Sequence, residues 1–414
     1  MSSPLRRALQ APGFRRLFLA QAVSRWGDTF NYVAIVILVF RLTGSGFKVG
    51  ATVIFEIAPV LLFGFVAGVV VDRLPRRRVM IAADLGRALL VLMLVVLQEH
   101  LWAIYGVAFG LSALSVFFNP AATSVVPALV DERDLVGANS AIWSAAVISQ
   151  IVLAPVAGAL VSFAGPGPAF AINAASFVVS AALLIGLRLP PAPPKVSGRQ
   201  WDDVIEGLGL LRSSRLLRVL ASVQALAALS AGATSALLVV LAQRHLGVGA
   251  GRFGLLLGAI GVGAAVGPLV LQRLVRDVRR PSLLFGPYLL RGVVDLVLAA
   301  FSSFGIALGA LALYGVGTST GNVTYNSLLQ SSVADRFRGR VFASFDVVWQ
   351  SARLISIAAG GVAADALGIR SVYLLGGLLL IAAGLLGVTQ LHRSDLHTTV
   401  DTADRDPGLD GSSP

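Results

Sequence analysis

The sequence contains no cysteine, which excludes disulfide bonds, thiolate metal sites and a cysteine nucleophile. Charge is also scarce: 13% of the 414 residues are charged and 56% are hydrophobic, whereas soluble domains carry about 25% charged residues. No GxxxxGK[ST] phosphate loop and no His-Glu-x-x-His motif occurs. The four histidines fall in predicted loops or in the tail: His100, His245, His392 and His397. We expect a polytopic membrane protein that is not an enzyme and uses neither a metal nor a cofactor.

The basic residues are almost all arginines, and the formal net charge is +12. Such an excess can indicate nucleic-acid binding. Here the arginines lie in short segments between apolar runs and do not form one polar face. We therefore expect the bilayer as a partner, and no nucleic acid.

Long apolar runs dominate the chain, and each can form a helix that crosses a bilayer core about 30 Å thick. The sequence predicts twelve spans: 23–40, 49–71, 79–97, 101–118, 135–161, 169–187, 219–241, 253–271, 283–301, 305–321, 341–364 and 372–391. The basic segment 1–16 leads directly into a span that carries charges, so we expect no cleavable signal peptide. The fold class expected is an all-α membrane protein.

Arginine marks one side of these spans. The N-terminal segment and the loops after the even-numbered spans are rich in arginine, whereas the opposite loops hold few basic residues. Because Lys and Arg concentrate in cytoplasmic loops, we expect an inner-membrane protein with both termini in the cytoplasm.

One short loop, between the second and third spans, combines an acid with four arginines. It reads G-VVV-D-R-LP-RRR, from Gly68 to Arg78. An arginine at the middle of a bilayer costs roughly 2.5–3.5 kcal/mol or more, so this loop must face water. The spacing G-x-x-x-D-R-x-x-R-R resembles the signature loop of the major facilitator superfamily. The alternative is an ordinary positive-inside hairpin, although orientation alone needs neither the acid nor the glycine.

The two halves of the sequence repeat, as the resemblance implies. A shift of about 203 residues aligns Asn119 with Asn322 and Gly158 with Gly361. Parallel six-helix repeats around an axis along the membrane normal belong to the major facilitator fold. We expect two pseudo-symmetric six-helix bundles, at 1–187 and 217–391. A cytoplasmic linker, 188–216, carries an amphipathic helix from Trp201 to Leu208, and a disordered tail covers 392–414.

The resemblance also implies a latch that closes the cytoplasmic gate of a transporter. Asp72 would face the positive N-terminal end of the eleventh helix, and Arg73 would pair with Asp346. Asp84 and Arg87 follow the loop by about one and two turns, so we assign them to the gate in preference to the substrate path. The predicted gate residues are Gly68, Asp72, Arg73, Arg76, Arg77, Asp84, Arg87 and Asp346.

Acids inside apolar spans are candidates for proton coupling, because such groups are costly and usually face the bundle interior. Arg25, Asp28 and Asn31 share one face of the first span. Asp28 would gain and lose a proton during transport, with Arg25 adjusting its affinity. The alternative is a permanent ion pair between Arg25 and Asp28. Glu56 has no cation in its own span, so burial favours its protonated form. It is either a proton carrier or a carboxylic acid bonded to a backbone carbonyl.

Polar side chains in the central spans could line a pocket for an amphipathic organic molecule. The alternative is interhelical hydrogen bonding, worth about 0.6 kcal/mol for each bond. The predicted substrate-binding residues are Asn31, Asn119, Gln150, Gln224, Asn322, Asn326, Gln350 and Arg353. Glycine pairs spaced by four, such as Gly254 and Gly258, favour close helix packing.

Further stretches narrow the resemblance to one branch of the superfamily. The sequences 118–121 (FNPA) and 126–130 (VPALV) look like the enterobactin-exporter and macrolide-efflux branch. The fifth span departs from the antiporter motif G-P-x-x-G-G, because 154–159 reads APVAGA. The resemblance implies a proton-coupled exporter of amphipathic organic compounds that works by alternating access, and we expect it to be a monomer. The alternatives are a lysophospholipid or lipid flippase and a membrane sensor that does not transport.

Overall fold

The computed structural model describes residues 4–189, 208–212, 214–274 and 280–391, and the long elements in these ranges are helices. The predicted amphipathic helix of the linker and the predicted disordered tail lie outside the described residues. The helices of the first half are α1 (Pro4–Gln10), α2 (Pro12–Thr43), α3 (Gly46–Arg73), α4 (Arg76–Leu97), α5 (Leu101–Val125), α6 (Leu135–Ile148), α7 (Ala154–Ala164) and α8 (Gly167–Ile185). Short turns η1 (Val126–Ala128) and η2 (Glu132–Asp134) precede α6, and the π-helical turn η3 (Ser149–Leu153) joins α6 to α7.

The second half contains α10 (Arg215–Ala236), α11 (Leu238–Val240), the turn η4 (Leu241–His245), α12 (Ala250–Leu274), α13 (Pro281–Ala300), α14 (Phe304–Ser332), α15 (Asp335–Ala366) and α16 (Ile369–Gln390). Within the described ranges, eleven helical segments are long and apolar enough to cross a membrane. The long helix α2 is not among them, because Arg25, Asp28 and other polar residues interrupt its apolar run. Its 32 residues extend about 48 Å, so it completes the twelve predicted spans.

Each half packs mainly on itself. In the first half α8 packs against α2 and α4, and α5 packs against α3 and α4. In the second half α10 packs against α15 and α16, while α14 packs against α12 and α13. Contacts between the halves concentrate on two helix pairs, α3 with α15 and α7 with α12.

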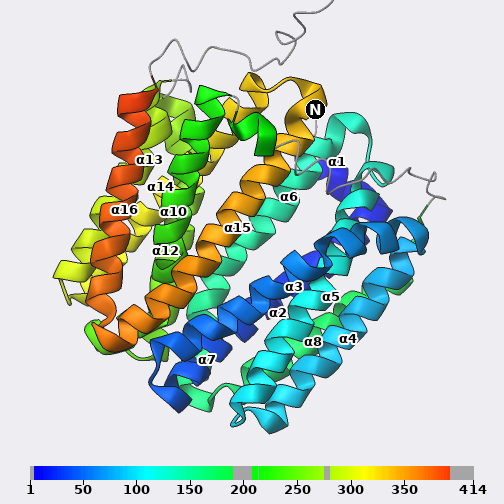
Figure 1. Ribbon diagram of the computed structural model, residues 1–414. Helices are drawn as coiled ribbons and strands as arrows, with labels where there is room; N and C mark the ends of the chain where they lie inside the picture. The colour runs from blue at the N-terminus through cyan, green and yellow to red at the C-terminus, as the bar shows by residue number, and fades with distance from the viewer. Residues whose placement is uncertain (1–3, 190–207, 213, 275–279, 392–414) are drawn as a thin grey trace, which may run out of the picture.

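The halves meet at the end of the molecule where α3 begins and α15 ends, which we call the closed end. Figure 1 shows α3 and α15 meeting at the lower left and diverging towards the upper right. Glycines permit the approach. A Cβ added to Gly254 of α12 would lie 2.4 Å from the carbonyl oxygen of Ala154, and one on Gly46 of α3 would lie 2.9 Å from the Cβ of Ala364.

The helices α3 and α15 run antiparallel along this contact. Gly46 lies against Gly361 and Ala364, and Gly50 lies against Ile357 one turn further on. An apolar cluster follows, in which Ile357 joins side chains of α3 and α10: Val53, Ile57 and Ala236. The opposite end, where α3 ends at Arg73 and α4 begins at Arg76, is called the arginine end below.

The glycine contacts predict an unequal response to added methyl groups. In Gly263→Ala the new Cβ would lie 1.8 Å from the carbonyl oxygen of Ala312 on α14, so α12 and α14 must move apart. We expect a loss of about 1–3 kcal/mol in stability. The control Gly309→Ala adds the same methyl group to α14 where nothing lies within 4 Å, and its melting temperature should not fall. Thermal unfolding of the purified protein in detergent measures both, and equal melting temperatures would contradict the packing argument.

Candidate functional site

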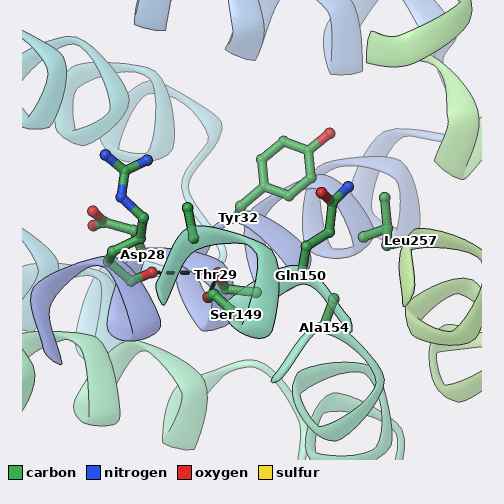
Figure 2. Close-up of a pocket in the computed structure, with 9 residues that line it drawn as sticks. Asp28, Thr29, Tyr32, Ser149, Gln150, Ala154 and Leu257 are labelled. Carbon is green, nitrogen blue, oxygen red and sulfur yellow. Dashed lines mark hydrogen bonds between the residues drawn. The ribbon is translucent and has the colours of Figure 1, made fainter. Parts of the chain in front are cut away.

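A cavity of about 320 Å³ lies between the halves, beside the seam of α7 with α12. Figure 2 shows that α2 contributes Asp28, Thr29 and Tyr32, that the segment from α6 to α7 contributes Ser149, Gln150 and Ala154, and that Leu257 of α12 faces them. Arg25 also lines the cavity. The structure therefore brings together Arg25, Asp28 and Gln150, three of the residues selected from the sequence.

The π-helical turn η3 positions one wall of this cavity. It covers Ser149–Leu153, and its first residue, Ser149, shares a hydrogen bond of 2.5 Å with the hydroxyl of Thr29 on α2. A π-helical turn inserts one extra residue into a helix and commonly marks functional sites. Here Gln150, within the turn, lines the cavity, and Pro155 lies in the first turn of α7, which follows directly.

Asp28 is exposed to the cavity although it belongs to the middle of α2. Two cations lie within electrostatic range of it, Arg87 of α4 and Arg25 on its own helix. Asn173 of α8 lies close to it. Arg25 and Asp28 form no ion pair within the part of the chain that the structure describes. The alternative of a permanent Arg25–Asp28 ion pair is therefore wrong for this conformation.

Glu56 of α3 is half-buried, next to the apolar cluster that joins α3 to α15. A cation on the other half, Arg353 of α15, and an anion on α2, Asp28, lie within electrostatic range of it. The Glu56 charge therefore interacts across the boundary between the halves. Its backbone carbonyl also accepts a hydrogen bond from the hydroxyl of Ser112 on α5.

Asp84 and Arg87 form a buried ion pair inside the first half. Both side chains are at most 4% exposed. Asp84 also accepts a hydrogen bond of 2.7 Å from the hydroxyl of Ser180 on α8. The Arg87 guanidinium lies over the rings of Phe118 and Phe177, at 4.4 and 4.5 Å from their centres. We assigned this pair to the gate, and the contacts named above lie within the first half, where α4 packs against α5 and α8.

The remaining gate residues lie at the arginine end. Gly68 and Asp72 belong to the last turns of α3. Arg77 donates a hydrogen bond of 3.2 Å to the carbonyl oxygen of Leu187, and Arg76 donates one of 3.4 Å to that of Ser124. Arg73 and Asp346 are both exposed, and the described side chains include no ion pair between them. The predicted latch at the arginine end stays a prediction, because Arg73 and Asp346 are not paired in this conformation.

The predicted substrate-binding residues do not gather at one place in the structure, and Gln150 alone among them lines the cavity. Asn31 is buried, and Gln224 accepts a hydrogen bond of 3.1 Å from the hydroxyl of Tyr288 inside the second half. Gln350 and Arg353 are half-buried on α15. The exposed residues are Asn119, Asn322 and Asn326. Only Gln150 of this set lines the cavity described above.

Sequence reasoning missed two buried charges in the second half, Arg291 and Asp295 of α13. Arg291 donates a hydrogen bond of 2.9 Å to the hydroxyl of Tyr314, and Asp295 lies 3.5 Å from the hydroxyl of Ser230. Both charges interrupt an apolar run, so the criterion that selected Asp28 could have found them. Arg291 also occupies, in the third span of its half, the place that Arg87 occupies in α4.

Comparison with known proteins decides the family. The profile of a family of the major facilitator superfamily, described as transmembrane secretion effector, matches residues 2–407. The chain belongs to this family. The relatives named below are a transporter, an efflux protein and an exporter, which confirms both the resemblance and the expectation that the protein is not an enzyme.

Three characterised or named relatives are similar to this chain over most of its length. YfiS of Bacillus subtilis, an uncharacterized MFS-type transporter, is 28% identical over 93% of this chain and 94% of its own length. Macrolide efflux protein A of Streptococcus pyogenes is 24% identical, covering 92% of this chain and 97% of its own. The enterobactin exporter EntS of Escherichia coli is 25% identical over 80% of each chain.

Solved structures confirm the fold. The nucleoside transporter NupG superposes with a TM-score of 0.70 at 13% identity, covering 91% of this chain and 98% of its own. A bacterial homologue of the iron transporter ferroportin in an inward-facing state gives 0.71 at 17% identity, covering 91% and 98%. The predicted all-α, multi-pass major facilitator fold is therefore confirmed.

The buried pair Asp84–Arg87 yields a prediction about stability. In Arg87→Met the Asp84 carboxylate loses its cation in the protein interior, and we expect a loss of about 3–5 kcal/mol. Removing both charges in Asp84→Leu/Arg87→Met should recover most of this loss, because no charge is then left unpaired. Thermal unfolding in detergent is the measurement.

A matched control is Arg133→Met, since Arg133 and Asp131 form an ion pair whose side chains are 74% and 70% exposed. Exposed pairs contribute about 0–1 kcal/mol, so this variant should unfold close to the wild type. An Arg87→Met protein as stable as the control would show that the buried pair is not structural.

Proposed function

We propose that this transporter is a proton-coupled exporter of amphipathic organic compounds that works by alternating access. The observation that carries the proposal is the cavity between the halves, which places Asp28 and Gln150 beside the apolar side chain of Leu257. Such a combination suits a molecule with polar groups on an apolar body. The names of two relatives, a macrolide efflux protein and an enterobactin exporter, support export of molecules of this kind.

In this proposal the arginine end faces the cytoplasm and the closed end faces outward. The arginine-rich loops follow the positive-inside rule in this orientation, which also places both termini in the cytoplasm. The protein would act as a monomer in the inner membrane, with bundles 1–187 and 217–391 tilting around the cavity. The substrate would enter from the cytoplasmic side, where Arg73 and Asp346 are apart and exposed in this conformation.

Protons would act through Asp28 and Glu56. Asp28 faces the cavity, so it can exchange a proton with water there and with the substrate's polar groups. Protonation of Glu56 would remove its attraction to Arg353 on the other half. The contact between α3 and α15 would then weaken, and the closed end could open. Export of substrate and entry of protons would be linked because both use the same boundary between the halves.

The coupling is tested by Asp28→Asn and Glu56→Gln. In everted membrane vesicles, uptake of a radiolabelled macrolide or a fluorescent amphipathic dye should increase with an imposed proton gradient in the wild type. Both variants should lose this dependence, because neither an amide at 28 nor one at 56 can carry a proton at neutral pH.

The matched control is Asp131→Asn, which removes an acid that is exposed outside the cavity. It should keep the gradient dependence of the wild type. Normal gradient dependence in both Asp28→Asn and Glu56→Gln would overturn the coupling assignment. If an uncoupler does not reduce uptake by the wild type, the lipid flippase is favoured. If no amphiphile is taken up, the membrane sensor is favoured.

The gate is tested separately by Arg73→Ala. The variant should insert and fold normally, because Arg73 is exposed, yet it should transport more slowly since the closed state of the arginine end loses an ion pair. Arg133→Ala removes an exposed arginine at the same end without touching the predicted gate. Equal transport rates in the two variants, measured at equal membrane content, would count against the latch.

A further inference from the structure

A set of polar contacts joins the two halves at the closed end. Asp365, in the last turn of α15, reaches the first turn of α3. One carboxylate oxygen accepts a hydrogen bond of 2.7 Å from the backbone N–H of Gly46. The other accepts bonds of 3.1 Å from the N–H of Phe47 and 2.5 Å from the hydroxyl of Ser45. Three donors of the first half therefore bind one carboxylate of the second half.

The donors suit a negative charge. The first N–H groups of a helix have no partner inside the helix and carry the positive end of its dipole. Ser45 is the N-cap of α3, and its hydroxyl oxygen accepts a bond of 3.2 Å from the N–H of Lys48. Asp365 satisfies the N–H groups of Gly46 and Phe47, which the serine leaves free.

Arg244, in the turn η4 of the second half, adds a second connection. Its guanidinium donates to the carbonyl oxygen of Gly44, which lies in the turn between α2 and α3. It also lies 3.4 Å from Asp365, and 5.4 Å from the ring centre of Phe40 on α2. Arg244 thus holds Asp365 in place and binds the first half directly.

These contacts differ from the buried ion pair of α4 in one physical respect. The side chains of Arg244 and Asp365 are 40% and 30% exposed, whereas Arg87 and Asp84 are at most 4% exposed. Water can therefore solvate Arg244 and Asp365 when the halves separate. Breaking these contacts leaves no charge stranded in an apolar interior, so the connection is reversible.

The second seam between the halves lacks this charge. At the closed end of the pair α7 and α12, Ser162 lies near the first turn of α12, against Gly251. The approximate repeat of 203 residues places Ser162 opposite Asp365 in the other half. Among the described side chains, a carboxylate therefore binds the start of α3 in one seam, whereas a serine lies at the start of α12 in the symmetry-related seam.

We infer that Asp365, supported by Arg244, is a latch that holds the closed end shut while the arginine end is open. It acts on the same two helices as the predicted latch of Asp72 and Arg73, but at their opposite ends. Asp72 lies at the end of α3, where α15 begins, and Asp365 lies at the end of α15, where α3 begins. Tilting the halves to engage one latch pulls the other apart, so the two compete.

The inference is tested by distances between the halves, and the absence of native cysteine allows labels to be placed without removing any residue. Leu42→Cys and Leu367→Cys put spin labels on exposed positions of the two halves at the closed end, and Val136→Cys with Gln330→Cys does so at the arginine end. Pulsed electron resonance then gives the populations of both conformations for each pair.

Asp365→Asn should shift the ratio of conformations about tenfold or more towards the one in which the halves have separated at the closed end. The N–H groups at the start of α3 then lose a charged acceptor, because the amide is neutral and has only one accepting oxygen. Arg244→Gln should shift it in the same direction. The labels at the arginine end should move closer together in both variants, a change that misfolding would not produce. Asp131→Asn, an exposed acid paired within its own half, should leave both distributions unchanged.

Unchanged distances at the closed end in both Asp365→Asn and Asp365→Ala would overturn the inference. The result is independent of the proposed substrate and proton coupling, because no transport is measured. Adding Arg73→Ala to Asp365→Asn should return the ratio towards that of the wild type. If Asp365→Asn shifts the ratio and Arg73→Ala alone does not, the latch at the closed end stands and the predicted gate at the arginine end fails.

Discussion

Close backbone contact between the halves is the constraint on which this structure depends. At the closed end α3 approaches α15 through Gly46 and Gly361, and α12 approaches α7 through Gly254 and Gly158. Lipid tails are as apolar as the helices, so association in a bilayer relies on such packing and on polar contacts. The halves therefore touch at one end, and the helices α3 and α15 diverge towards the other.

The polar groups inside the spans fall into two physical classes. Asp84 with Arg87, and Arg291 with Tyr314, are enclosed within a single half and stabilise its packing. Asp28 and Glu56 lie at the boundary between the halves, where their surroundings change whenever the halves move. This division follows from the cost of an unsatisfied charge in a low-dielectric interior: the enclosed groups have an ion-pair or hydrogen-bond partner in their own half, and those that face the boundary can be solvated or protonated in turn.

The fold could be predicted because spans about 20 residues long are set by bilayer thickness, and the signature loop from Gly68 to Arg78 identified the superfamily. The site could be predicted only in part. Helix spacing correctly put Arg25 and Asp28 on one face, but it cannot say that Arg87 of α4 also lies near Asp28. We assigned Arg87 to the gate because it follows the arginine loop by about two turns. Spacing along one helix could not show that its aromatic partners, Phe118 and Phe177, come from α5 and α8. Asp365 passed unnoticed because the N–H groups it binds belong to the backbone of another helix.

The polarity of α2 has a consequence for how the protein is made. This helix is not among those apolar enough to cross a membrane by composition, yet it lies beside α8, with Gly27 in close contact with Ser176 and Asn173. A segment that carries an arginine and an aspartate partitions weakly into lipid on its own. We therefore expect the stable residence of α2 in the bilayer to depend on its packing against α8, a helix that is synthesised later in the chain.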